Sequence, residues 1–263
     1  MSLTAIRSTD QIKVEARQLQ KDGGPYRCPG CGEGLTLKKG RVVTHHFAHR
    51  PPLTCAWGLG ESAEHLEAKM AIHDALRADP AVTEVRLEAP GGDVAVADVL
   101  ARIRGQWVAI EVQRSDLTAE QVARRTANYH ALGVHVLWVA LACPGLAGDR
   151  YSPRTWEKWL HFACYGRVYY GSHGQVVVPY HFDEHTLYVE PRHWFDRGDL
   201  RYGGGYERRS SRRRTPLQGR PAVISSHFQA RRCPARRTKT MAVPACSLYI
   251  DRHPAWWTAA ATV

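Results

Sequence analysis

The chain has 263 residues, of which 36 are Lys or Arg and 25 are Asp or Glu, so its formal net charge at pH 7 is +11. It has no long apolar run and no basic start followed by an apolar segment, so we expect a cytoplasmic protein without a membrane segment. Its length allows one or two packed domains plus a tail. Seven cysteines in such a chain favour metal binding or free thiols over a disulfide framework.

The first predicted unit covers residues 1–58 and contains closely spaced Cys and His side chains. A CxxC knuckle aims two thiolates at one point, and an HxxH motif places two imidazoles about one helical turn apart. Two sulfur and two nitrogen donors suit tetrahedral Zn²⁺ in a closed, structural site. The predicted ligands are Cys28, Cys31, His46 and His49. Cys55 is an alternative fourth ligand and His45 a competing one. The alternative interpretation is that this segment binds no metal and holds two reduced surface thiols beside unrelated histidines.

Residues 61–77 are predicted to form a helix. Leu66, Met70 and Leu76 roughly mark its apolar face. A second, polar row has the spacing i, i+4, i+8, with one further acid beside it. That row consists of Glu61, His65 and Lys69, with Glu64 beside it. For this helix taken alone, an ordinary solvated face is the preferred interpretation.

Three β-branched-rich segments follow, at residues 83–89, 93–105 and 106–113, and the last two read as an antiparallel hairpin. A two-residue loop at 104–105 places Asp98 opposite Glu111, and a loop at 105–106 places it opposite Gln113. Either register puts all three side chains on one face.

Glu111 lies within an apolar strand, where an unpaired buried charge costs several kcal/mol. Two adjacent carboxylates repel each other unless a cation lies between them or one is protonated. Asp98 and Glu111 are therefore candidates for an Mg²⁺ or Mn²⁺ site, since hard divalent ions take carboxylate oxygens. The alternative is that both side chains point outwards from a half-exposed sheet.

The next helix is predicted to begin at a capping box formed by Thr118 and Gln121 and to end before Gly133. A buried strand follows at residues 134–142, which completes the order αβββαβ over residues 59–145. Helix residues that are candidates for phosphate contacts, or alternatively for a solvated face, are Arg124, Arg125 and Asn128.

Residues 146–197 are predicted to form an aromatic-rich helix and hairpin. Tyr169, Tyr170 and Tyr180 are candidates for base stacking, although aromatic residues at such positions more often belong to the core. Residues 201–263 hold 13 Lys or Arg and 2 Asp or Glu, which equals the whole net charge. Because the start of this region is rich in Arg, Gly and Ser, we expect a disordered basic tail over residues 198–263, either a solubilising end or a phosphate-binding arm.

The order of several short motifs resembles the CoiA-like competence protein family over about residues 20–140. These motifs are CPGC, HFAH, ESAEHLEAK, ADV, AIEVQRS, the R-x-x-x-Y of Arg125 and Tyr129, and LWVA. The resemblance implies a PD-(D/E)xK, restriction-endonuclease-like αβββαβ core behind an N-terminal zinc-finger-like segment. It also implies a role in handling DNA during natural transformation and DNA recombination.

Carried over residue by residue, the family pattern makes Asp98 the first acid and Glu111 the second. Gln113 stands where Lys is usual, so it cannot supply a positive charge, although its amide can orient a water molecule. The helix residues that match the family's pattern, with Glu64 or Glu61 as an extra acid, are Glu61, Glu64, His65 and Lys69.

The resulting expectation is a metal-dependent deoxyribonuclease with structural Zn²⁺ and catalytic Mg²⁺ or Mn²⁺. Its expected partner is DNA, with recombination or DNA-uptake proteins as further candidates. The alternative is a DNA-binding or recombination-accessory protein that uses the same fold without cutting.

Overall fold

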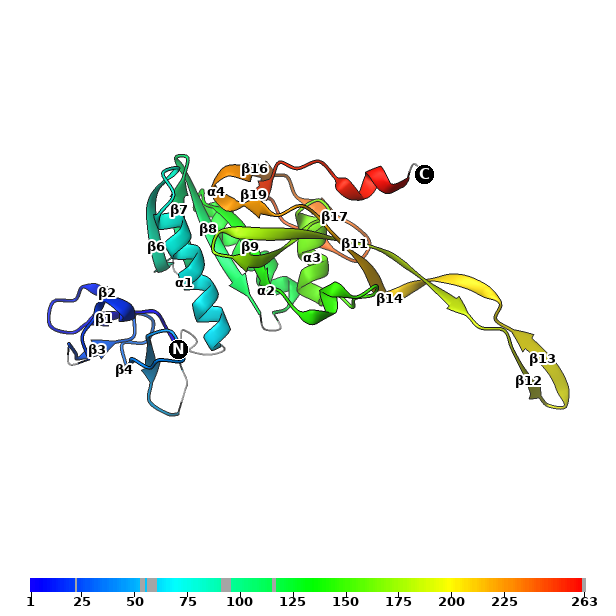
Figure 1. The fold of residues 1–263 in the computed structure, drawn as a ribbon, viewed down its shortest axis with the longest axis horizontal. Coiled ribbons are helices and arrows are strands. Elements are labelled where there is room, and N and C mark those ends of the chain that lie inside the picture. Colours follow the sequence, from blue (N-terminus) through cyan, green and yellow to red (C-terminus); the bar gives the residue numbers. More distant parts are fainter. Residues whose placement is uncertain (22, 53–54, 56–60, 91–95, 115–116, 262–263) are drawn as a thin grey trace.

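The computed structural model of the chain describes all residues except 22, 53–54, 56–60, 91–95, 115–116 and 262–263. It shows a mixed α/β protein with a small N-terminal sheet, a large central sheet and a long two-stranded arm (Figure 1). The predicted boundary between residues 58 and 59, and the first residues of the strand predicted at 93–105, lie outside the described residues.

The N-terminal region is a five-stranded antiparallel sheet with the order β2-β1-β3-β4-β5. Its core is small and consists of Ala5, Ala16, Tyr26, Leu37 and Phe47. A core of this size supplies little hydrophobic stabilisation, so additional cross-links are expected. The elements are β1 (Thr4–Arg7), β2 (Lys13–Glu15), η1 (Ala16–Gln18), β3 (Tyr26–Arg27), β4 (Gly34–Lys38) and β5 (His46–His49).

The central region follows the predicted order of helix, three strands, helix and strand. A two-residue turn at Arg104 and Gly105 joins β7 to β8, and both residues have positive φ angles of 47° and 79°. Such a turn fixes the hairpin register, here Ile103 opposite Gln106. The elements are α1 (Ala63–Arg77), β6 (Val82–Pro90), β7 (Val96–Ile103), β8 (Gln106–Gln113), α2 (Ala119–Ala131) and β9 (His135–Leu141).

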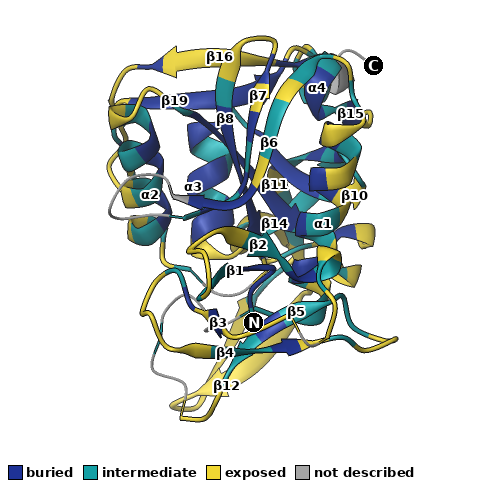
Figure 2. Cartoon of the chain, turned by 90° about the vertical axis from the view of Figure 1, so that its left-hand side faces the viewer, coloured by how far each residue is buried: buried dark blue, intermediate teal, exposed yellow. Residues whose placement is uncertain are grey.

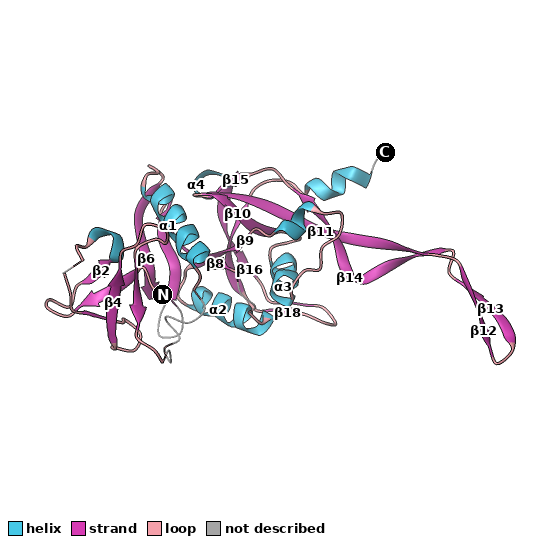
Figure 3. Cartoon of the chain, turned by 60° about the horizontal axis from the view of Figure 1, so that its bottom comes forward, coloured by secondary structure: helices cyan, strands magenta, loops and turns pink. Residues whose placement is uncertain are grey.

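The helices α1 and α2 cover opposite faces of the central sheet (Figure 3). The strand β9 is parallel to β8 and places Trp138 beside Glu111. The Trp138 Nε1 atom donates to Thr126 of α2, so Glu111 and Trp138 belong to the α2 side of the sheet. The buried polar residues of β8 therefore face a helix rather than solvent.

The predicted helix and hairpin after residue 146 are present. The helix α3 packs Trp156, Trp159 and Leu160 into the core, and Tyr169 and Tyr170 are also buried, which confirms their interpretation as core residues. The elements are η2 (Pro144–Ala147), α3 (Thr155–Ala163), β10 (Val168–His173), β11 (Val176–Val189), β12 (Arg192–Asp196), β13 (Asp199–Gly203) and β14 (Tyr206–Gln218).

The prediction of a disordered tail over residues 198–263 is wrong. The strand β19 is buried along its whole length and pairs with β9 and with the exposed β16 (Figure 2). The high Arg content hid a short buried strand whose large apolar residues are Leu248, Tyr249 and Ile250, while Arg231 and Arg232 of the neighbouring β16 are exposed. The elements are β15 (Ala222–Val223), α4 (Ile224–His227), β16 (Phe228–Cys233), β17 (Arg236–Arg237), β18 (Ala242–Val243), β19 (Cys246–Asp251) and η3 (Trp256–Ala261).

Within the described part of the chain, none of the helices has the length and apolar character that crossing a membrane requires.

Candidate active site and metal centre

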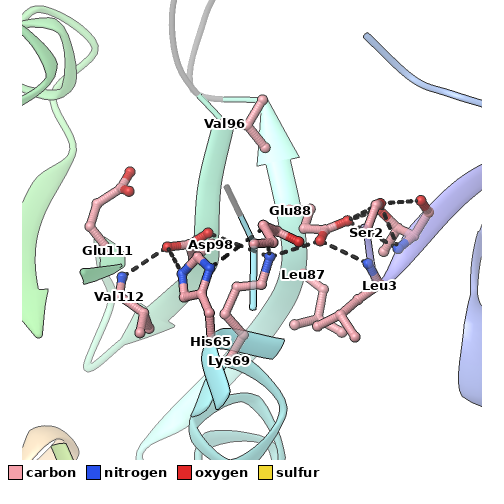
Figure 4. A network of polar contacts seen from close by, with 12 residues as sticks. Ser2, Leu3, His65, Lys69, Leu87, Glu88, Val96, Asp98, Glu111 and Val112 are labelled. Atoms are coloured by element: carbon pink, nitrogen blue, oxygen red, sulfur yellow. Dashed lines mark hydrogen bonds and ion pairs between the residues drawn. The ribbon is translucent and has the colours of Figure 1, made fainter. Parts of the chain in front are cut away.

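The helix α1 carries a fully buried lysine at the centre of a group of acids. The Lys69 side chain is 0% exposed, and its Nζ atom lies 2.5 Å from Glu61, 2.9 Å from Glu88 and 3.6 Å from Asp98 (Figure 4). A buried ammonium is stable only when paired, and these three carboxylates raise the pKa of Lys69 despite its burial. The predicted polar row of Glu61, His65 and Lys69 therefore faces the protein interior, and its interpretation as a solvated face is wrong.

Glu88 connects this group to the N-terminal sheet. It has a positive φ of 45° in β6, and its carboxylate accepts hydrogen bonds from Leu3 N (2.8 Å), Thr4 N (3.0 Å) and the Ser2 and Thr4 hydroxyls. Burial opposes ionisation of Glu88, but Lys69 and these donors hold its pKa below the usual range. The start of β1 is thus tied to Lys69 through one carboxylate (Figure 4).

Asp98 lies at the end of the pairing between β7 and β8. The last pair of this ladder is Val99 opposite Ile110, so the register places Asp98 opposite Glu111, as the 104–105 loop predicts. The Asp98 Oδ2 atom accepts a hydrogen bond from Val112 N at 2.8 Å and lies 3.3 Å from His65 Nε2. Its carboxylate therefore binds the backbone of β8 and side chains of α1.

Glu111 is bound from the other helix. Its side chain is 1% exposed, its Oε2 atom lies 2.5 Å from the Arg125 guanidinium, and its Oε1 atom accepts a hydrogen bond from the Tyr129 hydroxyl. Arg125 and Tyr129 are four residues apart, so both project from one face of α2. The predicted capping box of Thr118 and Gln121 starts this helix. The capping box therefore sets where α2 begins, and with it the face of the helix on which both side chains lie.

The pKa values of the two strand-end carboxylates, Asp98 and Glu111, are shifted in opposite directions. Burial opposes ionisation of Asp98, but Lys69 and His65 outweigh it and hold the pKa of Asp98 well below its usual value. Burial, supported by the charge on Asp98, raises the pKa of Glu111 to about 7, although Arg125 opposes the shift. Asp98 therefore stays ionised, whereas Glu111 takes up a proton more readily than an exposed glutamate.

The remaining predicted site residues have different surroundings. Gln113 is buried two residues beyond Glu111 and shares its face of β8. Glu64 is exposed and pairs with Arg114 at 2.9 Å, so the extra acid in the cluster is Glu61 and not Glu64. The physical reason is helical geometry: Glu61, His65 and Lys69 are spaced four residues apart, and Glu64 falls off that row.

The predicted phosphate contacts of α2 also need correction. Arg125 points inward, where it binds Glu111 and donates to Val96 O at 3.2 Å, so it is neither a phosphate ligand nor part of a solvated face. Asn128 is half-buried and its Nδ2 atom is buried. Arg124 is exposed, which is compatible with its predicted contact to a phosphate.

A second group, near the N-terminus, consists of sulfur and imidazole donors. The ligand atoms of Cys28, Cys31, His49 and Cys55 all lie within 4.8 Å of one another, and these four residues could hold a metal ion. Gly30 N donates to the Cys28 sulfur at 3.4 Å, which shapes the predicted knuckle. Burial raises the pKa of Cys28 to about 12, so a thiolate there needs a cation.

The geometry of this group fits tetrahedral zinc. With Zn–S near 2.3 Å and Zn–N near 2.0–2.1 Å, a tetrahedron separates two sulfurs by about 3.8 Å and a sulfur from a nitrogen by about 3.5 Å. The Sγ atoms of Cys28 and Cys55 are 3.8 Å apart, and Cys31 Sγ lies 3.4 Å from His49 Nε2. A disulfide would require about 2.05 Å, so the sulfurs are not bonded to each other.

The prediction that His46 is a ligand is wrong, and the alternative ligand Cys55 completes the group. The HxxH segment is not helical but forms β5, in which residues three apart point to opposite faces. His46 Nδ1 instead lies 2.9 Å from Thr44 O, and His45 is likewise outside the group. The sequence signal for Cys55 was only its place after the histidines, which does not distinguish it from His46.

The sequence analysis assigns no site role to two residues, Glu88 and Tyr129, that bind members of this group. Glu88 looked like part of an ordinary strand, and nothing in its neighbourhood indicates that it binds Lys69. Tyr129 was noted only as part of the R-x-x-x-Y motif. Its spacing from Arg125 was the signal that both residues hold one acid.

Replacing Lys69 by Met should destabilise the protein by about 3–5 kcal/mol at pH 8, because Glu61, Glu88 and Asp98 would share no buried cation. The loss should be smaller at pH 5, since buried carboxylates without a partner have raised pKa values and bind protons in the folded state. Urea unfolding monitored by tryptophan fluorescence measures both values. Lys38→Met, at an exposed position of β4, is the control; an equal loss in both variants would contradict the assignment.

Comparison with known proteins identifies two matching family models. The model "Competence protein CoiA, N-terminal domain" matches residues 8–58, and "Competence protein CoiA, nuclease-like domain" matches residues 61–145, together slightly more than half of the chain. The chain is also 31% identical over 118 residues to the "Competence protein CoiA" of Bacillus subtilis (strain 168), which is 43% of this chain and 31% of that protein. The match thus spans about a third of the relative's length. No solved structure matches the chain.

Proposed function

The chain belongs to the CoiA-like family of competence proteins, and we propose that it is a metal-dependent nuclease that hydrolyses phosphodiester bonds in DNA. The observation that carries the proposal is the pair of strand-end carboxylates, half-buried Asp98 and buried Glu111, in the nuclease-like domain. Oxygen donors of this kind are those that Mg²⁺ and Mn²⁺ prefer.

In this proposal a restriction-endonuclease-like, PD-(D/E)xK arrangement is formed by β7 and β8 with α1 and α2 on either side. An Mg²⁺ or Mn²⁺ ion held by Asp98 and Glu111 would supply Lewis acidity toward the scissile phosphate and a bound water of lowered pKa. Tyr129 and Arg125 keep the Glu111 carboxylate in one orientation through their bonds to its two oxygens. Lys69 holds Asp98 and screens developing negative charge.

His65 and Gln113 complete the proposed machinery. The His65 Nε2 atom lies 3.3 Å from Asp98, which raises the pKa of His65 against the effect of its burial. This places a proton carrier beside the acid. Gln113 shares the Glu111 face, and its amide can orient the attacking water by hydrogen bonds, although it brings no positive charge to the phosphate.

The Cys28, Cys31, His49 and Cys55 group is proposed to hold structural Zn²⁺, because four protein ligands leave no open position for a substrate. Its role would be to fix a sheet with a small core. Through β1 and Glu88, that sheet also contributes to the position of Lys69.

A second candidate function is a DNA-binding or recombination-accessory protein that does not cut. One observation favours it: each acid already has protein donors, since Lys69 and His65 bind Asp98 while Arg125 and Tyr129 bind Glu111. In such a protein these contacts would stabilise the fold alone.

Incubation of the purified chain with supercoiled plasmid and with circular single-stranded DNA separates the two functions. We expect nicking or linearisation with added Mg²⁺ or Mn²⁺ and none without a divalent ion. EDTA is left out of the comparison, because a chelator would also remove a structural zinc. Binding of either DNA without any cleavage under all metal conditions would favour the accessory role.

A further inference from the structure

The long arm that projects from the central sheet lies beyond the region that the family models match. It comprises residues 186–214: the outer parts of β11 and β14 and the hairpin of β12 and β13 (Figure 1). The hairpin closes with Asp196 opposite Asp199 around Arg197 and Gly198, which both have positive φ angles. Every residue of β12 and every residue of β13 except Gly203 is exposed, so the side chains of the hairpin are displayed to solvent on both faces.

Exposed apolar side chains gather on this arm. Nine large hydrophobic residues are exposed in the described part of the chain, and six of them belong to the arm. These six are Tyr188, Trp194, Phe195, Leu200, Tyr202 and Tyr206. Exposed aromatic residues at this density indicate an interaction surface rather than chance, since single exposed apolar residues are normally scattered.

The pairing of β12 and β13 sorts these side chains by face. His193 lies opposite Tyr202 and Phe195 opposite Leu200, so all four share one face of the ribbon. Phe195 is 74% exposed and Tyr202 is 75% exposed, which leaves both rings open for stacking. The opposite face carries Arg192, Trp194 and Arg201, with the Arg192 guanidinium 5.5 Å from the Trp194 ring centroid.

The base of the arm is rich in arginine. Between residues 186 and 214 the sequence has eight Arg, no Lys, and four acidic residues, which gives a net charge of +4. Four consecutive residues, 210–213, form a bulge opposite His185 in the ladder between β11 and β14, where Glu184 pairs with Arg214 and Thr186 with Arg209. A ligand that lies along the arm therefore meets guanidinium groups at the base and aromatic rings nearer the tip.

We propose that the arm binds a single-stranded nucleic acid, with bases stacked on Phe195 and Tyr202 and phosphates on the arginines at the base. Aromatic rings and Arg side chains are the combination that holds unpaired bases and their backbone without sequence readout. This goes beyond the proposed nuclease chemistry and does not depend on it, because it concerns a separate element and requires no cleavage.

Charge argues against the other occupants. Two arms packed on each other would bring two net charges of +4 together, which disfavours a second copy. Asp196 and Asp199 at the very tip oppose entry into an anionic membrane surface or the groove of a duplex. A single strand crossing the ribbon at Phe195 and Tyr202 can leave the acidic tip outside its path.

Fluorescence anisotropy with a labelled 20-nucleotide oligothymidylate tests this proposal on the full chain, without added divalent ion so that the probe stays intact. Phe195→Ala/Tyr202→Ala keeps every charge and should weaken binding by about 30-fold or more, since each lost stack contributes substantially. The control Val42→Ala/Leu132→Ala removes two exposed apolar side chains outside the arm and should bind like the wild type. Unchanged thermal unfolding verifies that both double variants fold.

A second pair of measurements distinguishes the strand from its competitors. Arg208→Gln/Arg212→Gln should reduce the slope of log K against log salt by about 1.4, because each phosphate contact to a single strand contributes about 0.7. A 20-base-pair duplex should bind more weakly and be less affected by loss of the two rings. The proposal is overturned if Phe195→Ala/Tyr202→Ala binds oligothymidylate like the wild type, if it loses duplex binding as strongly, or if it instead abolishes a dimer or binding to anionic vesicles.

Discussion

Asp98→Ala and Glu111→Ala should each reduce Mg²⁺-dependent DNA cleavage by about 1,000-fold or more, while Glu64→Ala should retain it. The metal's stabilisation of the transition state is worth several kcal/mol, and every 1.36 kcal/mol is a factor of ten in rate. Glu64 is the matched control, because it is an acid in the same domain that pairs with Arg114 at the surface instead of joining the buried group. Plasmid nicking at fixed protein concentration measures all three variants.

Loss of activity alone would not separate a metal ligand from a structural acid. Removing Glu111 leaves the buried Tyr129 hydroxyl and Arg125 without their shared acceptor, so Glu111→Gln, which preserves the shape and keeps one acceptor oxygen, belongs in the same set. We expect Glu111→Gln to fold like the wild type by circular dichroism and to lose Mn²⁺ uptake by calorimetry. Full activity in Asp98→Ala or Glu111→Gln, or equal loss in Glu64→Ala, would refute the proposed site.

Cys55→Ser should release zinc and unfold the N-terminal sheet, whereas His46→Ala should keep the metal. A structural Zn²⁺ contributes on the order of 10 kcal/mol of binding free energy to a small domain, and here the apolar core is only five residues. The purified wild type should contain about one zinc per chain, Cys55→Ser close to none, and His46→Ala the wild-type amount, by elemental analysis. The opposite ranking of the two variants would restore the HxxH ligand set.

The loss of zinc should also reach the nuclease-like domain. Leu3 and Thr4 donate backbone hydrogen bonds to Glu88, and Glu88 binds Lys69. Unfolding of β1 would therefore remove backbone donors from this buried carboxylate. Hydrogen exchange should therefore increase in β6 and α1 of Cys55→Ser, and not in α3. An effect confined to residues 1–55 would show that the two regions fold independently.

The sequence alone carried the local features of the fold. A two-residue turn that includes Gly105 is predicted from the sequence and limits the hairpin to two registers, of which the structure has the one with Asp98 opposite Glu111. The capping box at Thr118 and Gln121 likewise marks the start of α2 within four residues of chain. The family resemblance came from the order of such short motifs, and both family models confirm it.

The prediction that failed, the disordered tail over residues 198–263, was based on amino-acid composition and not on a pattern of apolar positions. The Arg-rich region after residue 198 resembled a disordered tail, yet its last strand, β19, is buried beside β9. A six-residue strand needs only a few apolar positions. These are easily outnumbered by the charged residues that cover the same sheet on its exposed side.

Only the tertiary structure decided which polar side chains share a site. Ser2 and Glu88 are 86 residues apart yet hydrogen-bonded. Cys55 replaces His46 because β5 is a strand, and Lys69 is a buried cation rather than a surface one. Turns and caps are encoded within a few neighbouring residues, whose backbone geometry they fix directly. The partner of a buried charge depends instead on how distant segments pack, and that information is spread over the whole chain.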